Sequence, residues 1–525
     1  MEAVLMQRAV TAALQAARWG CAGEAAVAGA GQQPAGVVRL GPALRATGGA
    51  VRASRLGPVR AHVAGERSKE AAGEVAAAAA AEEEEDAVRL FVGLPADVVV
   101  SDGRGVSRPR AVSAALRALK LLGVDGVELP VSWAAVQPGG SGAWFEWAGY
   151  RAVAAMVRDA GLDLRVSLVT DGDALPEWVA DAAAADPDIL FTDSSGHRRE
   201  GCLSFAVDEL PVLVGKSPLE AYEAFFRSFA DEFKDFFGST ITDVTVSLGP
   251  NGELRYPSYP PGSNNGDGYS GVGEFQCYDK YTLARLKRHA ESSGQPLWGL
   301  SGPHDGPRYE ESPESSAFFR EPGGSSKTAY GEFFLSWYAG ELLAHGDRVL
   351  AAASRAFAGA PVELSARVPL LRGSSAAEAA TAGLHGGYGP VAEMLARHGC
   401  TAIASGVDAA AAAAAALARV KAACYERGAR LAAESAALAV ARDGAGGTGA
   451  WLSARRTRPR QFTYQRMGAE FFAPGHWPLF VQFVRALECP EEAHEDDLPA
   501  GGETLTVPSA SAPAVPDGAR AVQTV

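Results

Sequence analysis

The chain has 525 residues, a formal net charge of −14 at pH 7 and an apolar fraction of 47%. This acidic balance argues against nucleic acid as a partner, because a phosphate backbone attracts clustered Lys and Arg. No run of about 18 strongly apolar residues is present, so we expect no membrane-spanning segment. The six cysteines are scattered without a CxxC pair, which excludes a zinc ribbon and gives no sign of a disulfide framework.

Residues 1–65 differ in composition from the rest of the chain. They contain seven arginines, no lysine and only two acidic residues, a balance typical of an organelle transit peptide. Residues 66–87 are expected to form an Ala/Glu-rich linker, in which the acidic run 82–86 is a solvated spacer. At the other end, residues 490–525 are rich in Pro, Ala and acids, and we expect a disordered tail.

From residue 88 to residue 489, short apolar segments rich in β-branched residues alternate with amphipathic helical patterns. Eight strands separated by helices predict a (β/α)₈ barrel rather than an open sheet. The wide interval between the third and fourth strands predicts long loop insertions at the C-terminal face of the strands. The expected strands are 88–94, 126–131, 162–169, 241–248, 362–368, 401–404, 430–433 and 461–464.

The stretch Gly249–Tyr259 directly follows the fourth of these strands. Its glycines and prolines end the strand and leave Glu253 at the carboxyl end, where the catalytic groups of such a barrel lie. A carboxyl group among Tyr256, Tyr259 and prolines is expected to be partly desolvated, which favours the neutral acid that can protonate a leaving oxygen. For an arbitrary glutamate, capping a turn is the better interpretation.

Several motifs that occur in order along the chain favour a catalytic role for Glu253 over a turn-capping role. They include Gly249-Pro-Asn-Gly-Glu-Leu-Arg-Tyr-Pro-Ser-Tyr259, Gly273-Glu-Phe-Gln-Cys-Tyr-Asp-Lys280, Phe333-Phe-Leu-Ser-Trp-Tyr338 and Phe462-Thr-Tyr464. With these motifs the chain resembles plant β-amylases from about residue 90 to residue 487. The resemblance implies an inverting exo-hydrolase that releases maltose from the non-reducing ends of α-1,4-glucans, without a metal or organic cofactor. It also implies a plastid transit peptide and a place in the chloroplast stroma.

In this chemistry one carboxylic acid protonates the glycosidic oxygen, while a second carboxylate about 6.5–9.5 Å away deprotonates the attacking water. The resemblance places Glu253 on the general acid. An Ala-Ala-Glu-Ser-Ala run places Glu434 on the general base, although two of its neighbours differ from the family motif. Without the family, Glu434 would be interpreted as an exposed glutamate at a helix start. The resemblance further implies that Arg466, Ser405 and Arg255 bind substrate.

Other positions that the family uses to hold the sugar are changed. Pro130 replaces an aspartate and Val169 replaces a histidine, while Asp171 or Asp173 at best approximates the lid aspartate. A family Gly-Ile-His-Trp-Trp run aligns with Ala366-Arg-Val-Pro-Leu370, which lacks the histidine and both tryptophans. Each charged hydrogen bond to a buried sugar hydroxyl contributes about 1.5–3 kcal/mol. Losing three or four of them therefore costs about four or more orders of magnitude in kcat/KM.

We therefore expect a β-amylase-like protein of plastid starch breakdown with weak or lost catalysis and a regulatory or glucan-associated role. Its partners would be α-1,4-glucans or maltooligosaccharides and proteins that the sequence does not name. The alternative is an active β-amylase with a rebuilt subsite, and an unrelated barrel enzyme comes third. Residues 444–449 match GxGxxG, but they follow an alanine-rich helical pattern instead of a strand, which predicts a surface loop.

Overall fold

The computed structural model describes residues 88–139, 144–172, 174–258, 273–309, 311, 315–371, 376–407, 413–435, 459–468 and 470–488. The expectations for 1–65, 66–87, 444–449 and 490–525, and those for Tyr259 and Asp173, lie outside these residues.

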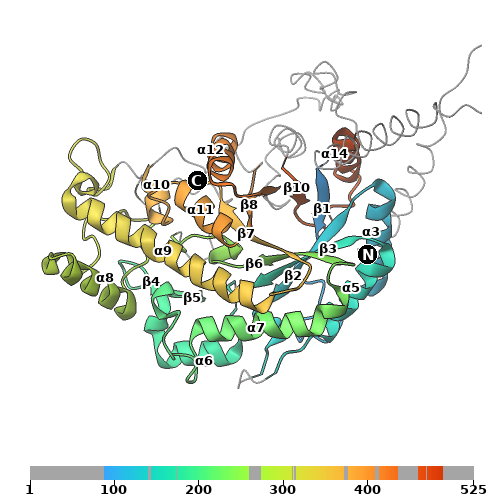
Figure 1. Cartoon of the computed structure of the whole chain (residues 1–525), viewed down its shortest axis with the longest axis horizontal. Helices are drawn as coiled ribbons and strands as arrows, with labels where there is room; N and C mark the ends of the chain where they lie inside the picture. Colours follow the sequence, from blue (N-terminus) through green and yellow to red (C-terminus); the bar gives the residue numbers. More distant parts are fainter. Residues whose placement is uncertain are drawn as a thin grey trace, which may run out of the picture.

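Eight parallel strands close into a barrel in the order β1-β10-β9-β8-β7-β6-β3-β2 (Figure 1). All eight strands lie within a few residues of the predicted positions, so the (β/α)₈ prediction is confirmed. The strands are β1 (Arg89–Gly93), β2 (Gly126–Ser132), β3 (Asp163–Val169), β6 (Ile241–Val246), β7 (Glu363–Pro369), β8 (Thr401–Ser405), β9 (Leu431–Glu434) and β10 (Gln461–Tyr464).

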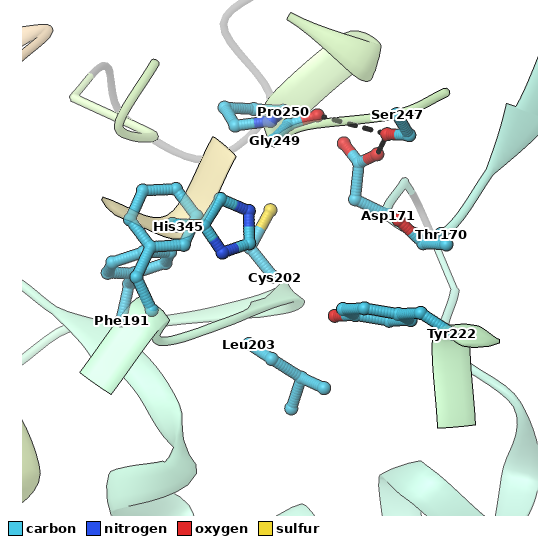
Figure 2. A pocket seen from close by; sticks show the side chains of 11 residues that line it. Thr170, Asp171, Phe191, Cys202, Leu203, Tyr222, Ser247, Gly249, Pro250 and His345 are labelled. Atoms are coloured by element: carbon cyan, nitrogen blue, oxygen red, sulfur yellow. Dashed lines mark hydrogen bonds between the residues drawn. The ribbon is translucent and has the colours of Figure 1, made fainter. Parts of the chain in front are cut away.

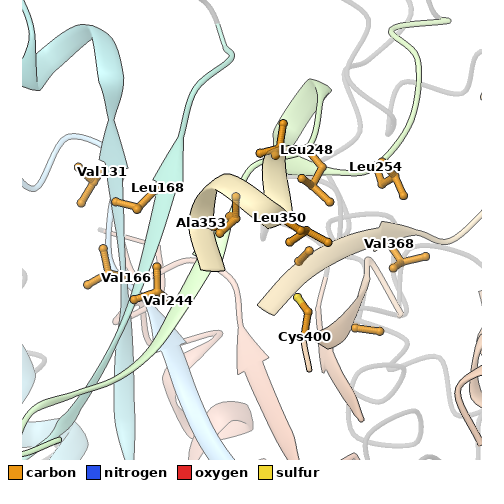
Figure 3. Close-up of a cluster of buried hydrophobic side chains, with 14 of the residues drawn as sticks. Val131, Val166, Leu168, Val244, Leu248, Leu254, Leu350, Ala353, Val368 and Cys400 are labelled. Carbon is orange, nitrogen blue, oxygen red and sulfur yellow. The ribbon is translucent and has the colours of Figure 1, made fainter. Parts of the chain in front are cut away.

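Side chains along each strand alternate between the helical layer and the barrel interior, as the period of two requires. On β3, Val166 and Leu168 are fully buried in an apolar cluster that also contains Val131 of β2 and Val244 of β6 (Figure 3). The intervening Arg165 and Ser167 take the other direction. They bond to Thr463 of β10 and Glu128 of β2 across the interior. Polar groups therefore fill the barrel axis.

Helices cover the outside of the barrel. Helix α7 begins at a capping box formed by Ser217 and Glu220, with Pro218 at its first position, an arrangement that satisfies exposed backbone donors. It packs along α9 on one side of the barrel, and α3 packs against α5 (Figure 1). The helices are α3 (Pro109–Leu122), α4 (Trp133–Val136), α5 (Ala148–Ala160), α6 (Glu177–Ala185), α7 (Pro218–Phe233), α8 (Lys280–Ser292), α9 (Ala329–Ala356), α10 (Ala376–Thr381), α11 (Gly389–Arg397), α12 (Ala413–Arg427) and α14 (Trp477–Glu488).

The predicted long insertions are present. Between β3 and β6 the chain forms α6, the antiparallel hairpin of β4 (Leu190–Thr192) and β5 (Arg198–Leu203), and α7. The interval between β6 and β7 contains α8 and α9. In the described part of the chain, no helix is long and apolar enough to cross a membrane. The four described cysteines, Cys202, Cys277, Cys400 and Cys424, are buried and free.

Candidate active site

The loop after β6 brings Glu253 to the mouth of the barrel. Gly249 opens this loop with φ 151°, and a Cβ atom there would lie 2.7 Å from the carbonyl oxygen of Glu253. Only glycine fits so close an approach. After a 3₁₀ turn at Pro250–Gly252, the backbone bridges to β7, where the Leu254 amide donates to the Arg367 carbonyl at 3.0 Å. Glu253 is therefore anchored at the carboxyl end of the strands, as predicted.

The surroundings of Glu253 differ from the expected apolar wall. Nε of Arg255 donates to Oε2 of Glu253 at 2.7 Å, and both side chains are nearly buried. The Arg255 amide also donates to the Glu253 carbonyl at 2.9 Å, and this tight turn brings the two side chains together. Tyr256 points elsewhere, stacked on Tyr338 with ring centroids 3.8 Å apart. Glu253 is buried, in keeping with the expected desolvation, but a guanidinium and not the ring of Tyr256 faces its carboxyl group.

Glu434 ends β9 and is buried, with 6% of its surface exposed. Its Oε1 accepts hydrogen bonds from Nε of Arg367 at 2.8 Å and from Oγ of Ser405 at 2.7 Å. Its Oε2 accepts from Nε of Arg367 at 3.1 Å and from Nε2 of Gln465 at 3.3 Å. Ser405, predicted to bind substrate, thus binds Glu434.

Arg367 of β7 also reaches a second buried carboxylate, which sequence analysis did not single out. Its Nη2 donates to Oε1 of Glu128 on β2 at 2.6 Å. Glu128 is fully buried and accepts further hydrogen bonds from Ser167 Oγ and Gln465 Nε2, both at 2.6 Å. Because Gln465 also contacts Glu434, the four side chains Glu434, Arg367, Glu128 and Gln465 form a closed ring, which we call the axial ring.

The electrostatics of this ring follow from its burial. Burial raises the pKa of Glu128, but the charges of Arg466 and Arg367 and the hydrogen bonds it accepts outweigh this effect and hold the pKa well below its usual range. For Arg367, burial lowers the pKa, but the carboxylates of Glu434 and Glu128 outweigh it and raise the pKa above its usual value. Glu128 and Arg367 are therefore both held as ions inside the barrel.

The remaining predicted residue, Arg466, lies beside the axial ring. Its Nη1 donates to the Leu94 carbonyl at 3.1 Å, and its Nη2 lies 3.8 Å from Oε2 of Glu128. The structure thus brings Glu434, Ser405 and Arg466 into one network. Glu253 and Arg255 form a second pair, which borders the network through the main chain of Arg367. The described residues include no group of three His, Cys, Asp or Glu side chains that could hold a metal ion.

The chain is similar in sequence to known proteins over most of the barrel. The family model of Glycosyl hydrolase family 14 matches residues 91–493. The chain belongs to this family. It is 43% identical over 434 residues to the protein named Inactive beta-amylase 9 from Arabidopsis thaliana, covering 78% of this chain and 80% of that protein. It is 40% identical over 433 residues to Beta-amylase 2, chloroplastic from Oryza sativa subsp. japonica, covering 76% and 77%.

A solved structure supports the fold of this family 14 member. The catalytic domain of beta-amylase from Paenibacillus polymyxa superposes with a TM-score of 0.61 at 23% identity, covering 76% of this chain and 98% of that one. The resemblance to β-amylases that the motifs indicated is therefore confirmed at the level of family and fold.

Around the mouth of this family 14 barrel, three positions at or near strand ends carry side chains that cannot bond to a sugar hydroxyl. Pro130 near the end of β2 and Val169 at the end of β3 are half-buried, and Leu370 follows β7 directly. These are the positions at which the resemblance implied an aspartate, a histidine and a tryptophan. The chain therefore has apolar side chains where the resemblance implied polar or aromatic groups.

Asp171, the candidate for the lid aspartate, is half-buried beside the Glu253 loop (Figure 2). Its carboxylate accepts a hydrogen bond from Ser247 Oγ and another from the backbone of Gly252. It lines a cavity of about 20 Å³ together with Cys202, Tyr222 and other side chains, a volume that fits about one water molecule. Asp171 thus holds the Glu253 loop through its bonds to Ser247 and Gly252. Burial of its carboxyl group raises its pKa to about 6.

Proposed function

We propose that this family 14 protein is a β-amylase-like component of plastid starch breakdown, with weak or lost catalysis and a glucan-associated or regulatory role. One observation carries the proposal: Pro130, Val169 and Leu370 place apolar side chains at the barrel mouth. Sugar hydroxyls bound there lose charged hydrogen bonds worth about 1.5–3 kcal/mol each. Turnover depends on those contacts more strongly than simple association does, because they must strengthen in the transition state.

The state of the two carboxyl groups points the same way. We assign Glu253 as the counterpart of the general acid and Glu434 as that of the general base. A general acid must face the glycosidic oxygen, and a general base must hold the attacking water. Here Glu253 accepts from Arg255, and Glu434 accepts from Arg367. Arg255, Ser405 and Arg466, proposed from the motifs to bind substrate, are each engaged with the protein.

The relatives support the remaining parts of the proposal. One similar protein is named inactive, and several others are named chloroplastic. We propose that residues 1–65 form a plastid transit peptide and 66–87 a linker. The barrel then spans 88–489, residues 490–525 form a tail, and the mature protein acts in the stroma. Its partners would be α-1,4-glucans or maltooligosaccharides, with additional protein partners.

An active β-amylase is the second candidate, favoured by a specific observation. Both Glu253 and Glu434 lie at the mouth of the same barrel and border Arg367, one through its main chain and the other through its side chain. Two carboxyl groups on different strand ends are the arrangement that inverting hydrolysis needs.

The two candidates are separated by a maltose-release assay on residues 66–525, with maltoheptaose and soluble starch as substrates. We expect kcat/KM to be lower than that of an active β-amylase by about four orders of magnitude, given three or four lost contacts. Robust release of β-maltose that Glu253→Gln abolishes would overturn the proposal and establish the active enzyme. A glucan pull-down with the same preparation is expected to retain the protein. Its loss would remove glucan association and leave a role through protein partners.

A further inference from the structure

Protein donors contact both carboxylate oxygens of Glu434. An ionised carboxylate offers about four lone-pair sites on its two oxygens. In the structure, Oε1 accepts from Arg367 and Ser405, and Oε2 accepts from Arg367 and Gln465. Three donor groups therefore make these four contacts, because the single N–H of Arg367 Nε is shared between the two carboxylate oxygens. A water placed to attack a sugar would have to compete with these three donors for the carboxylate.

Arg367 is held in this position from both sides. Its Nε faces Glu434 of β9 and its Nη2 faces Glu128 of β2, 239 residues away in the chain. Strand β7 is separated from β2 by β6 and β3, and from β9 by β8, so the side chain spans the barrel interior. With 6% of Arg367 and none of Glu128 exposed, a planar guanidinium between two buried carboxylates has a single favourable geometry.

We propose that Arg367 is a built-in inhibitory cation, which holds Glu434 in the axial ring and so prevents it from activating water. The inference rests on the proposed function of weak or lost catalysis and gives that loss a physical cause. Glu128 is the residue that keeps Arg367 in place, because it supplies the second negative charge on the far side of the guanidinium. Glucan association at the mouth does not require an unpaired Glu434. The same site can therefore bind a glucan without hydrolysing it.

The first test measures how reactive the Glu434 carboxyl group is, with a water-soluble carbodiimide and an amine on the folded protein. Trypsin releases Glu434 in the peptide 431–442, whose only acidic residue is Glu434, so mass spectrometry reports on this group alone. We expect little labelling in the wild type and several-fold more in Arg367→Met. The double variant Arg367→Met/Glu128→Gln avoids leaving Glu128 buried without its partner and keeps the test valid if the single variant is unstable.

Two references calibrate that measurement. Exposed Glu393 reports the reagent dose in every sample. The variant Arg348→Met removes an α9 arginine from another ion pair, with buried Asp208 after the 3₁₀ turn Phe205–Val207, and should leave Glu434 labelling at the wild-type level. Equal labelling in the wild type and both Arg367 variants would contradict the inhibitory role.

The second test is a double-mutant cycle of Arg367→Met and Glu434→Gln in urea unfolding. For members of one buried network we expect coupling of about tenfold or more in the unfolding equilibrium constant. Additive effects with unchanged labelling, in a wild type that releases no maltose, would overturn the role of Arg367 and leave the proposed function standing. A wild type that releases maltose robustly overturns the proposed function by itself, before any variant is made.

Discussion

Two ionised residues inside the barrel depend on each other. Moving a charged side chain out of water costs several kcal/mol, and removing one partner of a buried pair destabilises a protein by about 3–5 kcal/mol. Glu128 and Arg367 avoid this penalty because each bonds to the other and to at least one further group of the axial ring. Either residue alone would be a buried charge without a partner. Together they hold the guanidinium of Arg367 against Glu434 at the mouth of the barrel.

Asp171 provides a pH-dependent test at the same scale. Burial raises its pKa from 3.8 to about 6 in the folded protein. The folded state binds this proton more tightly than the unfolded chain does. The proton on Asp171 therefore contributes its whole stabilising effect below about pH 4, and this contribution is lost as pH rises through about 6. Asp171→Asn removes the titrating group. Relative to wild type, the unfolding free energy of this variant should therefore rise between about pH 4 and pH 7, as measured by urea denaturation.

A matched aspartate on the surface should behave in the opposite way. The pKa of Asp347 is lowered by its hydrogen bonds to His398 and Arg397. The ionised Asp347 therefore stabilises the fold above the pKa of the unfolded chain, and this contribution is lost in acid. Asp347→Asn should therefore lose a little stability, relative to wild type, as pH rises. Parallel pH curves for wild type and Asp171→Asn would show that Asp171 is not desolvated as the structure places it.

At the scale of elements, local pattern was sufficient to place the strands but not to pair the side chains between them. The eight strands were recognisable because β-branched and apolar residues recur with the period of two. Glu253 was recognisable because glycine and proline follow its strand. The partners of Arg367 were not, since Glu128 is 239 residues away and no nearby residue indicates the contact. The available signal was a charge flanked by apolar residues on each of two strands, Glu128 on β2 and Arg367 on β7, because buried charges are paired.

The neighbour of Glu253 was mispredicted for a related reason. The tyrosines that follow it in the sequence suggested an apolar pocket, yet Tyr256 stacks on Tyr338, which comes from the distant helix α9. Arg255 takes its place because the backbone turns tightly between residues 253 and 255. Side-chain direction in an irregular loop depends on such backbone detail, which composition alone does not reveal.

The hairpin β4–β5 gives a prediction about an element that supports the site. Gly201 of β5 lies against the loop after β3, and a Cβ atom there would overlap the carbonyl oxygen of Gly172. Gly201→Ala should displace the hairpin from the loop that carries Asp171 and lower the unfolding free energy by about 1–3 kcal/mol, as overpacking does. Chemical denaturation followed by circular dichroism measures the change.

Gly340 supplies the control for this substitution. It lies exposed within helix α9, and a Cβ atom there meets nothing within 4 Å. Because alanine is the better helix former, Gly340→Ala should raise the stability by about 0.5–1 kcal/mol. A destabilised Gly340→Ala, or a neutral Gly201→Ala, would contradict the packing described for these two elements.

For the whole molecule, the barrel closes only when its first and last strands meet. Strand β1 pairs with β10 in parallel, from Arg89 opposite Gln461 to Val92 opposite Tyr464. Closure leaves no strand edge unpaired, and open edges invite aggregation. Nearly the entire chain from residue 88 to residue 488 must therefore be present before the interior, with its axial ring, is sealed from water.

Truncation tests this dependence and the proposed domain boundaries together. A chain of residues 88–489 retains all eight strands, so we expect its thermal unfolding midpoint to lie within about 2 °C of that of residues 66–525, a change of less than about 1 kcal/mol. A chain that ends at residue 458 lacks β10 and α14, which exposes β1 and β9 as open edges and removes Gln465 and Arg466 from the network. That shorter chain should be insoluble or lack a cooperative transition by circular dichroism. If it instead folds as stably as residues 88–489, closure by β10 is not what stabilises the barrel. If residues 88–489 fail to fold, the proposed boundaries are wrong, because segments beyond the barrel are then needed to complete it.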